Sequence, residues 1–202
     1  MGVAKLHSPV ILSVSGWFSS QVNKRFFRFE DAIMSIKIRR LRNSDPILIS
    51  AAFREMGWNK PESQYQKYCQ LQEKGKIIVL VAEWNNDFAG YLKISWKSGY
   101  PFFQENNIPE IQDLNVIQKH RRKGVATNLM DEAEALICQN CLIVGIGVGL
   151  HPGYNAAQRL YVQRGYVPDA NGITWQGEYI KEGQQLVADD DLILYLTKRF
   201  PN

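Results

Sequence analysis

The stretch from Asp113 to Thr127 reads Asp-Leu-Asn-Val-Ile-Gln-Lys-His-Arg-Arg-Lys-Gly-Val-Ala-Thr, and it decides how the chain is interpreted. Its first part predicts a strand that ends near Ile117, and the apolar residues of 124–140 recur at helical spacing. Unpaired amides and the positive end of the helix dipole therefore face the turn between the two elements. Such a helix start suits an anion such as a pyrophosphate. An ordinary helix with a solvated basic face is the alternative.

The residues of this turn fit an anion site. Arg121, Arg122 and Lys123 add full positive charge next to the helix start. We expect Gly124 to let the backbone approach a ligand closely, and Ala126 to keep the first helical turn unobstructed.

The whole chain has the composition of one folded domain. It has 202 residues, 45% of them hydrophobic, and a net charge of +4, which suffices for one core and argues against disorder. Apolar runs stay short of the roughly 18 residues that a membrane helix needs. Residues 1–43 hold eight Lys and Arg against two acidic residues. This excess indicates an acidic partner or a membrane surface, or only an irregular extension of the chain.

A domain pattern is legible from Ser35 onward. We therefore expect an N-terminal extension at residues 1–34 and a single domain at residues 35–202. The serine-interrupted run at 8–18 is a poor secretory signal. Met34 is a candidate for the natural start, because the pattern begins there.

Apolar periodicity predicts a mixed α/β fold. Helices are expected to begin near Ser44, Lys60, Gly124 and Asn155, and a polar loop is expected between Trp96 and Glu110. The expected strands are 36–41, 76–84, 88–96, 110–117, 142–150, 173–179 and 192–197.

The three cysteines do not form a disulfide framework. Cys138 and Cys141 have the C-x-x-C spacing, but they fall at the end of a predicted helix, where the dipole disfavours a thiolate. We interpret the spacing as accidental, expect no metal site, and expect a reducing, cytoplasmic setting.

Gly145, Gly147 and Gly149 alternate along a predicted strand, so that one of its faces lacks side chains. Either the close approach of a ligand or the packing of a helix on the sheet explains this pattern.

Two segments resemble signatures of the GNAT superfamily of N-acetyltransferases. Arg121-x-x-Gly124-x-Ala126, which follows a strand, is similar to the acyl-CoA signature Gln/Arg-x-x-Gly-x-Gly/Ala. The segment 157–166 is similar to the family's Ala-x-x-Leu-Tyr-x-x-x-Gly-Phe helix. The resemblance implies a GNAT-like single domain, with a central mixed sheet, flanking helices and a splayed strand pair.

The same resemblance implies acetyl-CoA as the acyl donor. Its pantetheine arm would enter between the splayed strands and pair with backbone groups near Val116 and Gln118. The family often has Asn seven residues before its catalytic tyrosine, where this chain has Tyr154, followed by Asn155, which could cap the helix. The implied coenzyme-binding residues are Asn115, Val116, Gln118, Arg121, Arg122, Lys123, Gly124, Val125, Ala126, Thr127 and Asn155.

Tyr161 and Glu110 are the implied catalytic residues. Tyr161 matches the tyrosine that protonates the coenzyme A sulfur, although a core aromatic residue would also fit this helix. Glu110 lies eleven positions before Arg121, a spacing that resembles the catalytic glutamate of the family's histone acetyltransferases. An unbulged strand places Glu110 and Asp113 on opposite faces, so at most one should face the acceptor. Asp113, His151 or a water remain alternative bases.

The expected activity is transfer of an acetyl group from acetyl-CoA to a primary amine of a small molecule or peptide, in a ternary complex. The alternative is a non-catalytic domain that senses acyl-CoA or binds RNA. Aromatic residues do not interleave with the basic turn, so a nucleic-acid partner is not favoured. The acidic run 189–191 could attract a cationic acceptor, but we interpret it as solvated. We expect no membrane partner and leave a homodimer open.

Overall fold

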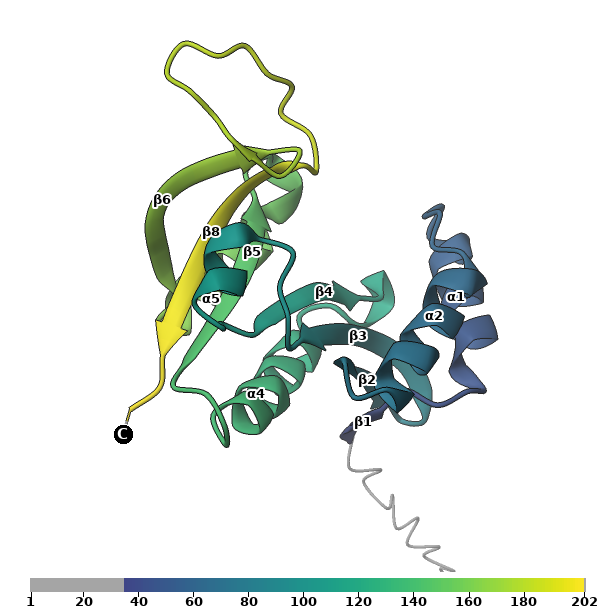
Figure 1. The fold of residues 1–202 in the computed structure, drawn as a ribbon. Coiled ribbons are helices and arrows are strands. Elements are labelled where there is room, and N and C mark those ends of the chain that lie inside the picture. Colours follow the sequence, from purple (N-terminus) through teal and green to yellow (C-terminus); the bar gives the residue numbers. More distant parts are fainter. Residues whose placement is uncertain (1–34, 202) are drawn as a thin grey trace, which may run out of the picture. The chain divides into compact units, whose positions relative to one another are not determined.

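A single mixed sheet organises residues 35–201, which are the residues that this computed structural model describes (Figure 1). The mixed α/β fold predicted from the sequence is confirmed, whereas the expected extension and the candidate start at Met34 lie outside the described residues. The strands follow the order β1-β2-β3-β4-β5-β8-β6-β7. The elements are β1 (Ile36–Arg40), α1 (Asp45–Glu55), α2 (Glu62–Glu73), β2 (Ile77–Trp84), β3 (Asp87–Ser95), α3 (Pro101–Glu105), β4 (Glu110–Val116), α4 (Val125–Ile137), β5 (Ile143–Gly149), α5 (Asn155–Gln163), β6 (Val167–Trp175), β7 (Glu178–Tyr179) and β8 (Leu192–Arg199).

Helices cover both faces of the sheet because successive strand residues point to opposite sides. On one face, Leu92 and Ile111 are buried in a core with α4 and α5. On the other face, Val79 and Tyr91 are buried beneath α1 and α2, which lie side by side in Figure 1.

The parallel strands β4 and β5 pair over only two residues. Glu110 lies opposite Gly145, and Ile111 lies opposite Ile146. Beyond this point β4 stays with β3 and β5 stays with β8, so within residues 35–201 the two facing edges have no strand partner. Figure 1 shows the strands leading apart, and the splayed pair that the resemblance implies is confirmed.

A β-bulge marks the point at which β4 leaves β5. The register with β3 shifts between Tyr91 and Lys93, and Asp113 adopts a left-handed φ of 58°. For a residue other than glycine this conformation costs about 1–3 kcal/mol and needs support from its surroundings. Part of that support comes from Asn115, whose side-chain amide donates a hydrogen bond to the Asp113 carbonyl at 3.0 Å.

Two segments differ from the sequence-based expectations. The expected polar loop before β4 contains α3, which begins with Pro101 and buries Phe103 completely. Proline is typical of a helix start, so this element was predictable. The strand expected at 173–179 is instead two strands, because β6 starts at Val167 and turns after Trp175 into β7.

The alternating glycines of β5 make room for aromatic rings. A Cβ atom on Gly145 would overlap the Phe103 ring, and one on Gly149 would overlap the Tyr154 ring. The structure therefore supports packing on the sheet, rather than an open face, at these two positions.

We expect Gly145→Ala to lower the free energy of unfolding by about 1–3 kcal/mol, because an added methyl group cannot enter this packed site without displacing the Phe103 ring. Urea denaturation measures the change. Gly99→Ala is the matched control, because a Cβ at Gly99 meets open space. Equal stabilities of the two variants would contradict the packing argument.

Candidate active site

The start of α4 presents uncapped amides, as the sequence predicted. A short 3-10 turn, Gln118–His120, follows β4, and Gly124 is the N-cap residue with a φ of 82°. No side chain among the described residues 35–201 caps the helix, and its first turn has no acidic residue. A Cβ on Gly124 would make only ordinary contacts of 3.6–3.7 Å with the protein, so within the protein the glycine is required by its left-handed backbone. The expected close approach of a ligand at Gly124 stays a prediction.

The basic residues before α4 are exposed, and two of them are held in place. The Arg121 Nε donates a hydrogen bond to the Val116 carbonyl at 3.2 Å, and the Lys123 Nζ lies 5.0 Å from the centre of the Trp84 ring. Arg122 has a left-handed φ of 62°. The side chains that follow become more exposed along the first turn of α4: Val125 is buried, Ala126 is half-buried and Thr127 is exposed.

The end of β4 turns backbone groups toward the splay. The Ile117 N–H donates to the Ala89 carbonyl at 2.9 Å, so Val116 lies in a non-hydrogen-bonded pair and directs its own N–H and carbonyl away from β3. The Gln118 carbonyl accepts the Arg121 N–H at 3.2 Å. The Gln118 carbonyl is therefore already hydrogen-bonded. A ligand at this turn could pair with the Gln118 N–H, which takes no part in that bond.

Tyr161 lies on α5 and is 5% exposed in the core beneath α4 and α5. Within the part of the chain that the structure describes, its hydroxyl makes no hydrogen bond. Burial raises the pKa of Tyr161 well above its usual value, so the phenol keeps its proton at neutral pH.

Tyr154 occupies the position at which the family often has asparagine, and its hydroxyl is anchored. It donates to the Asp190 carboxylate at 3.1 Å, and the His151 Nε2 lies 2.8 Å from the same oxygen. The His151 Nδ1 accepts the Gly153 N–H at 3.1 Å, which places the donated proton of a neutral ring on Nε2. The acidic run 189–191 is thus not merely solvated, because Asp190 ties its loop to the start of α5.

Asn155 does not cap α5. It has helical dihedral angles and is exposed, whereas the N-cap position belongs to Tyr154, which makes no side-chain capping bond. The expectation of an Asn155 cap was therefore wrong, because the short 3-10 turn at 152–154 precedes the helix and shifts its start by one residue.

Glu110 and Asp113 face the same side of the sheet, contrary to the expectation for a regular strand. Both carboxylates act on the Lys93 ammonium, and Lys93 shares the face of Tyr91 beneath α2. The bulge is the reason, because the extra residue restores Asp113 to the face of Glu110. Which of the two would face an acceptor stays a prediction.

The two carboxylates have opposite environments. Burial raises the pKa of Glu110, which is 5% exposed, and hydrogen bonds from the Ser98 hydroxyl at 2.5 Å and the Gln112 amide at 2.6 Å offset this only in part. Burial acts the same way on Asp113, but the Lys60 ammonium at 3.2 Å and the Tyr68 hydroxyl at 2.6 Å outweigh it and lower the pKa of Asp113.

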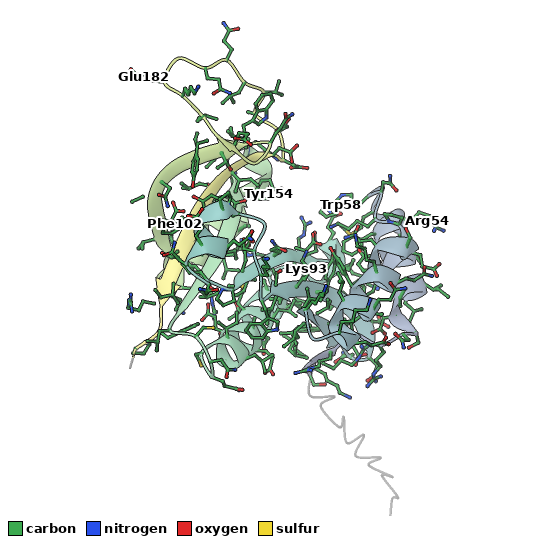
Figure 2. The ribbon with its side chains drawn as sticks, in the orientation of Figure 1. Arg54, Trp58, Lys93, Phe102, Tyr154 and Glu182 are labelled. Carbon is green, nitrogen blue, oxygen red and sulfur yellow. The ribbon has the colours of Figure 1, made fainter. Side chains whose placement is uncertain are left out.

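Sequence reasoning did not identify Lys60, Tyr68 or Lys93. They lie on separate elements, and only the packing of α2 over β3 and β4 brings them together. In the view of Figure 2, Lys93 lies on the sheet below Trp58, which follows α1, and below Tyr154, which precedes α5. No local motif signals such a cluster.

The remaining sequence expectations concern cysteines, metals and membranes. Cys138 lies at the C-cap of α4, as predicted for the C-x-x-C pair, and the three thiols are free. Residues 35–201 contain no cluster of three potential metal ligands. Over the same range, we find no helix with the length and apolarity needed to cross a membrane.

Comparisons with known proteins agree with this geometry. The sequence profile of the acetyltransferase (GNAT) family matches residues 41–166, whereas no curated protein sequence matches the chain. A putative GNAT acetyltransferase from Desulfovibrio desulfuricans has 13% identity and a TM-score of 0.61, covering 82% of this chain and 99% of its own. A ribosomal-protein-alanine N-acetyltransferase from Brucella melitensis has 16% identity and a TM-score of 0.59, covering 81% and 99%.

A third solved structure is an acetyltransferase from Salmonella typhimurium, described as modifying the N-terminal serine of ribosomal protein L7/L12. It has 12% identity and a TM-score of 0.62, covering 83% of this chain and 96% of its own. At such identities these structures support the fold alone. The family profile covers more than half of the chain. The chain therefore belongs to the acetyltransferase (GNAT) family and is an acetyltransferase enzyme.

Proposed function

We propose that this enzyme transfers the acetyl group of acetyl-CoA to a primary amine by direct attack within a ternary complex. The observation that carries the proposal is the separation of β4 from β5 beside the uncapped start of α4. Unpaired backbone groups and a positive helix end there suit the amide arm and the pyrophosphate of the donor. We assign this function to a domain at residues 35–202.

The donor site in this proposal uses the residues at the end of β4 and the start of α4. The Val116 N–H would donate to a carbonyl of the pantetheine arm, since the Val116 carbonyl already accepts the Arg121 Nε, and the first amides of α4 would hold the pyrophosphate. The exposed charges of Arg121, Arg122 and Lys123 support this assignment. When bound, acetyl-CoA supplies an acyl carbon activated by its thioester.

Tyr161 is the proposed general acid. Its hydroxyl is protonated because of burial and has no hydrogen-bond partner within residues 35–201, so its proton is available to a leaving sulfur. A phenol placed in this way can neutralise the charge that develops when the carbon–sulfur bond breaks.

Glu110 is the proposed general base, and Asp113 is not. A base needs a pKa near the working pH, and burial shifts Glu110 in that direction. Asp113 is stabilised as an anion by Lys60 and Tyr68, which makes it a poor proton acceptor. His151 is a weaker candidate because its two ring nitrogens are already hydrogen-bonded to Asp190 and Gly153.

The acceptor is an amine of a small molecule or a peptide. Two of the structures that share this fold are described as ribosomal-protein N-acetyltransferases, which makes peptide N-termini the first acceptors to test.

The free thiols support a reducing, cytoplasmic setting.

Calorimetry with coenzyme A, followed by measurement of thiol release with a panel of amines and peptides, tests the proposal. Binding with amine-dependent thiol release supports it. Binding without release from any acceptor would favour an acyl-CoA sensor, and an absence of binding would overturn the donor site.

We expect Arg122→Glu to weaken coenzyme A binding about tenfold, or about 1.4 kcal/mol, because it reverses an exposed charge beside the helix start. Isothermal calorimetry measures the dissociation constant. Arg199→Glu makes the same charge change at the end of β8, opposite Ile143, and should leave it unchanged. Equal weakening by both variants would indicate a long-range effect of net charge instead.

Tyr161→Phe should lower kcat about 100-fold, the range expected for loss of a general acid, while coenzyme A affinity stays within about twofold. The hydroxyl makes no hydrogen bond within residues 35–201, so its removal should leave the fold intact. Steady-state kinetics and calorimetry separate the two effects. Val162→Ala, an exposed neighbour on α5, is the control, and a parallel loss of affinity and kcat in Tyr161→Phe would refute the assignment.

Glu110→Gln should lower kcat about 100-fold and remove the acidic limb of the pH–rate profile. The base works when ionised, and burial raises the pKa of Glu110, so wild-type activity should fall as the pH drops through that raised pKa. Asp113→Asn should keep this limb, because the pKa of Asp113 is lowered. An unchanged limb in Glu110→Gln would exclude Glu110 as the base.

A further inference from the structure

Lys93 is a half-buried cation near the β4 bulge whose ammonium has no polar partner among residues 35–201. Lys60 is paired with Asp113 at 3.2 Å, and Glu110 is satisfied by Ser98 and Gln112. The Lys93 Nζ instead lies 5.0 Å from the centre of the Tyr68 ring. A half-buried ammonium without a hydrogen-bond acceptor is costly, so burial lowers the pKa of Lys93 and makes its neutral amine easier to form.

Lys93 lies on β3, the strand beside β4, at the level where the splay begins. Its Cα lies opposite that of Gln112, and Gln112 is the first β4 residue beyond the last pair with β5. Neighbouring strands lie about 4.8 Å apart, which the four-carbon stem of a lysine can cross. Its side chain rises on the face of Glu110 and Asp113.

An anion-binding role for Lys93 does not fit its surroundings. Any carboxylate or phosphate that approached the ammonium would also face Asp113 and Glu110, whose charges already act on Lys93. Two carboxylates would repel such a ligand. A neutral electrophile meets no such obstacle.

We propose that Lys93 is an internal acetyl acceptor, so that the enzyme acetylates its own Lys93 Nζ when no other amine is bound. This inference rests on the proposed function. The Lys93 nitrogen forms a bond to the acetyl carbon, and the carbon–sulfur bond of the donor breaks. The nitrogen gives up a proton to Glu110, and the sulfur takes one from Tyr161. The products are Nε-acetyl-lysine and coenzyme A.

Acetylation of Lys93 would raise the pKa of Glu110. It removes a positive charge that lowers the pKa of Glu110, so that pKa should rise. The other groups acting on Lys93 are Asp113, which favours its charged form, and the cations Lys60 and Lys67, which oppose it. The acidic limb of the pH–rate profile should therefore move to higher pH in Lys93→Gln and stay in place in Lys93→Arg.

The direct test incubates the full chain with acetyl-CoA and no other amine, and follows its intact mass and peptide map. We expect the addition of one acetyl group on Lys93, at a rate independent of protein concentration and at least tenfold faster than on the exposed Lys97. Tyr161→Phe should slow the addition at least tenfold, and Lys93→Arg should abolish it.

A second measurement needs no donor. Reductive methylation with ¹³C-formaldehyde gives each lysine a separate NMR signal, and the Lys93 signal, assigned by its loss in Lys93→Arg, should titrate at lower pH than that of Lys97. If Lys93 and Lys97 titrated at the same pH, the pKa of Lys93 would not be lowered and the inference would be overturned. If coenzyme A binds and added amines are acetylated while Lys93 is modified no faster than Lys97, the inference fails and the proposed function stands. If coenzyme A does not bind, both fail.

Discussion

The left-handed turn of the backbone at Asp113 is the constraint on which the rest of the site depends. It inserts a bulge into β4 just after the strand has made its two pairs with β5. The bend carries β4 away and leaves backbone groups on its free edge. The strain, about 1–3 kcal/mol, is offset by hydrogen bonds to the Asp113 side chain from Lys60 and Tyr68, and to its carbonyl from Asn115.

The same bulge brings opposite acid–base environments together. It turns Asp113 toward α2, where the ion pair with Lys60 stabilises the anion. Glu110 stays buried in the first of the two residue pairs that join β4 to β5, before the strands separate. Lys93 lies between them without a hydrogen bond of its own in the described range. One face of the sheet therefore holds a stabilised carboxylate, a carboxylate that is costly to ionise and an amine that is costly to protonate.

Aromatic residues shape the β5 side of the splay, across the gap from β4. Phe103 and Tyr154 occupy the space that side chains at Gly145 and Gly149 would fill, and Asp190 ties Tyr154 to the loop before β8. The glycine alternation was visible in the sequence, but not the rings that use it. Those rings come from a short helix and a helix start, and their approach depends on chain paths far from β5.

The sequence by itself determined most of the order of strands and helices, the basic turn at 121–123 before a helix that begins after a glycine, and a tyrosine on α5, because hydrophobic periodicity, glycine and local charge are encoded in neighbouring residues. Only the tertiary structure decided that Glu110 and Asp113 share a face, that Asn155 lies inside its helix, and that Lys60, Tyr68 and Lys93 join them. A single-residue bulge reverses the alternation of a strand, and the contacts that support it come from distant segments, so no local pattern could reveal them.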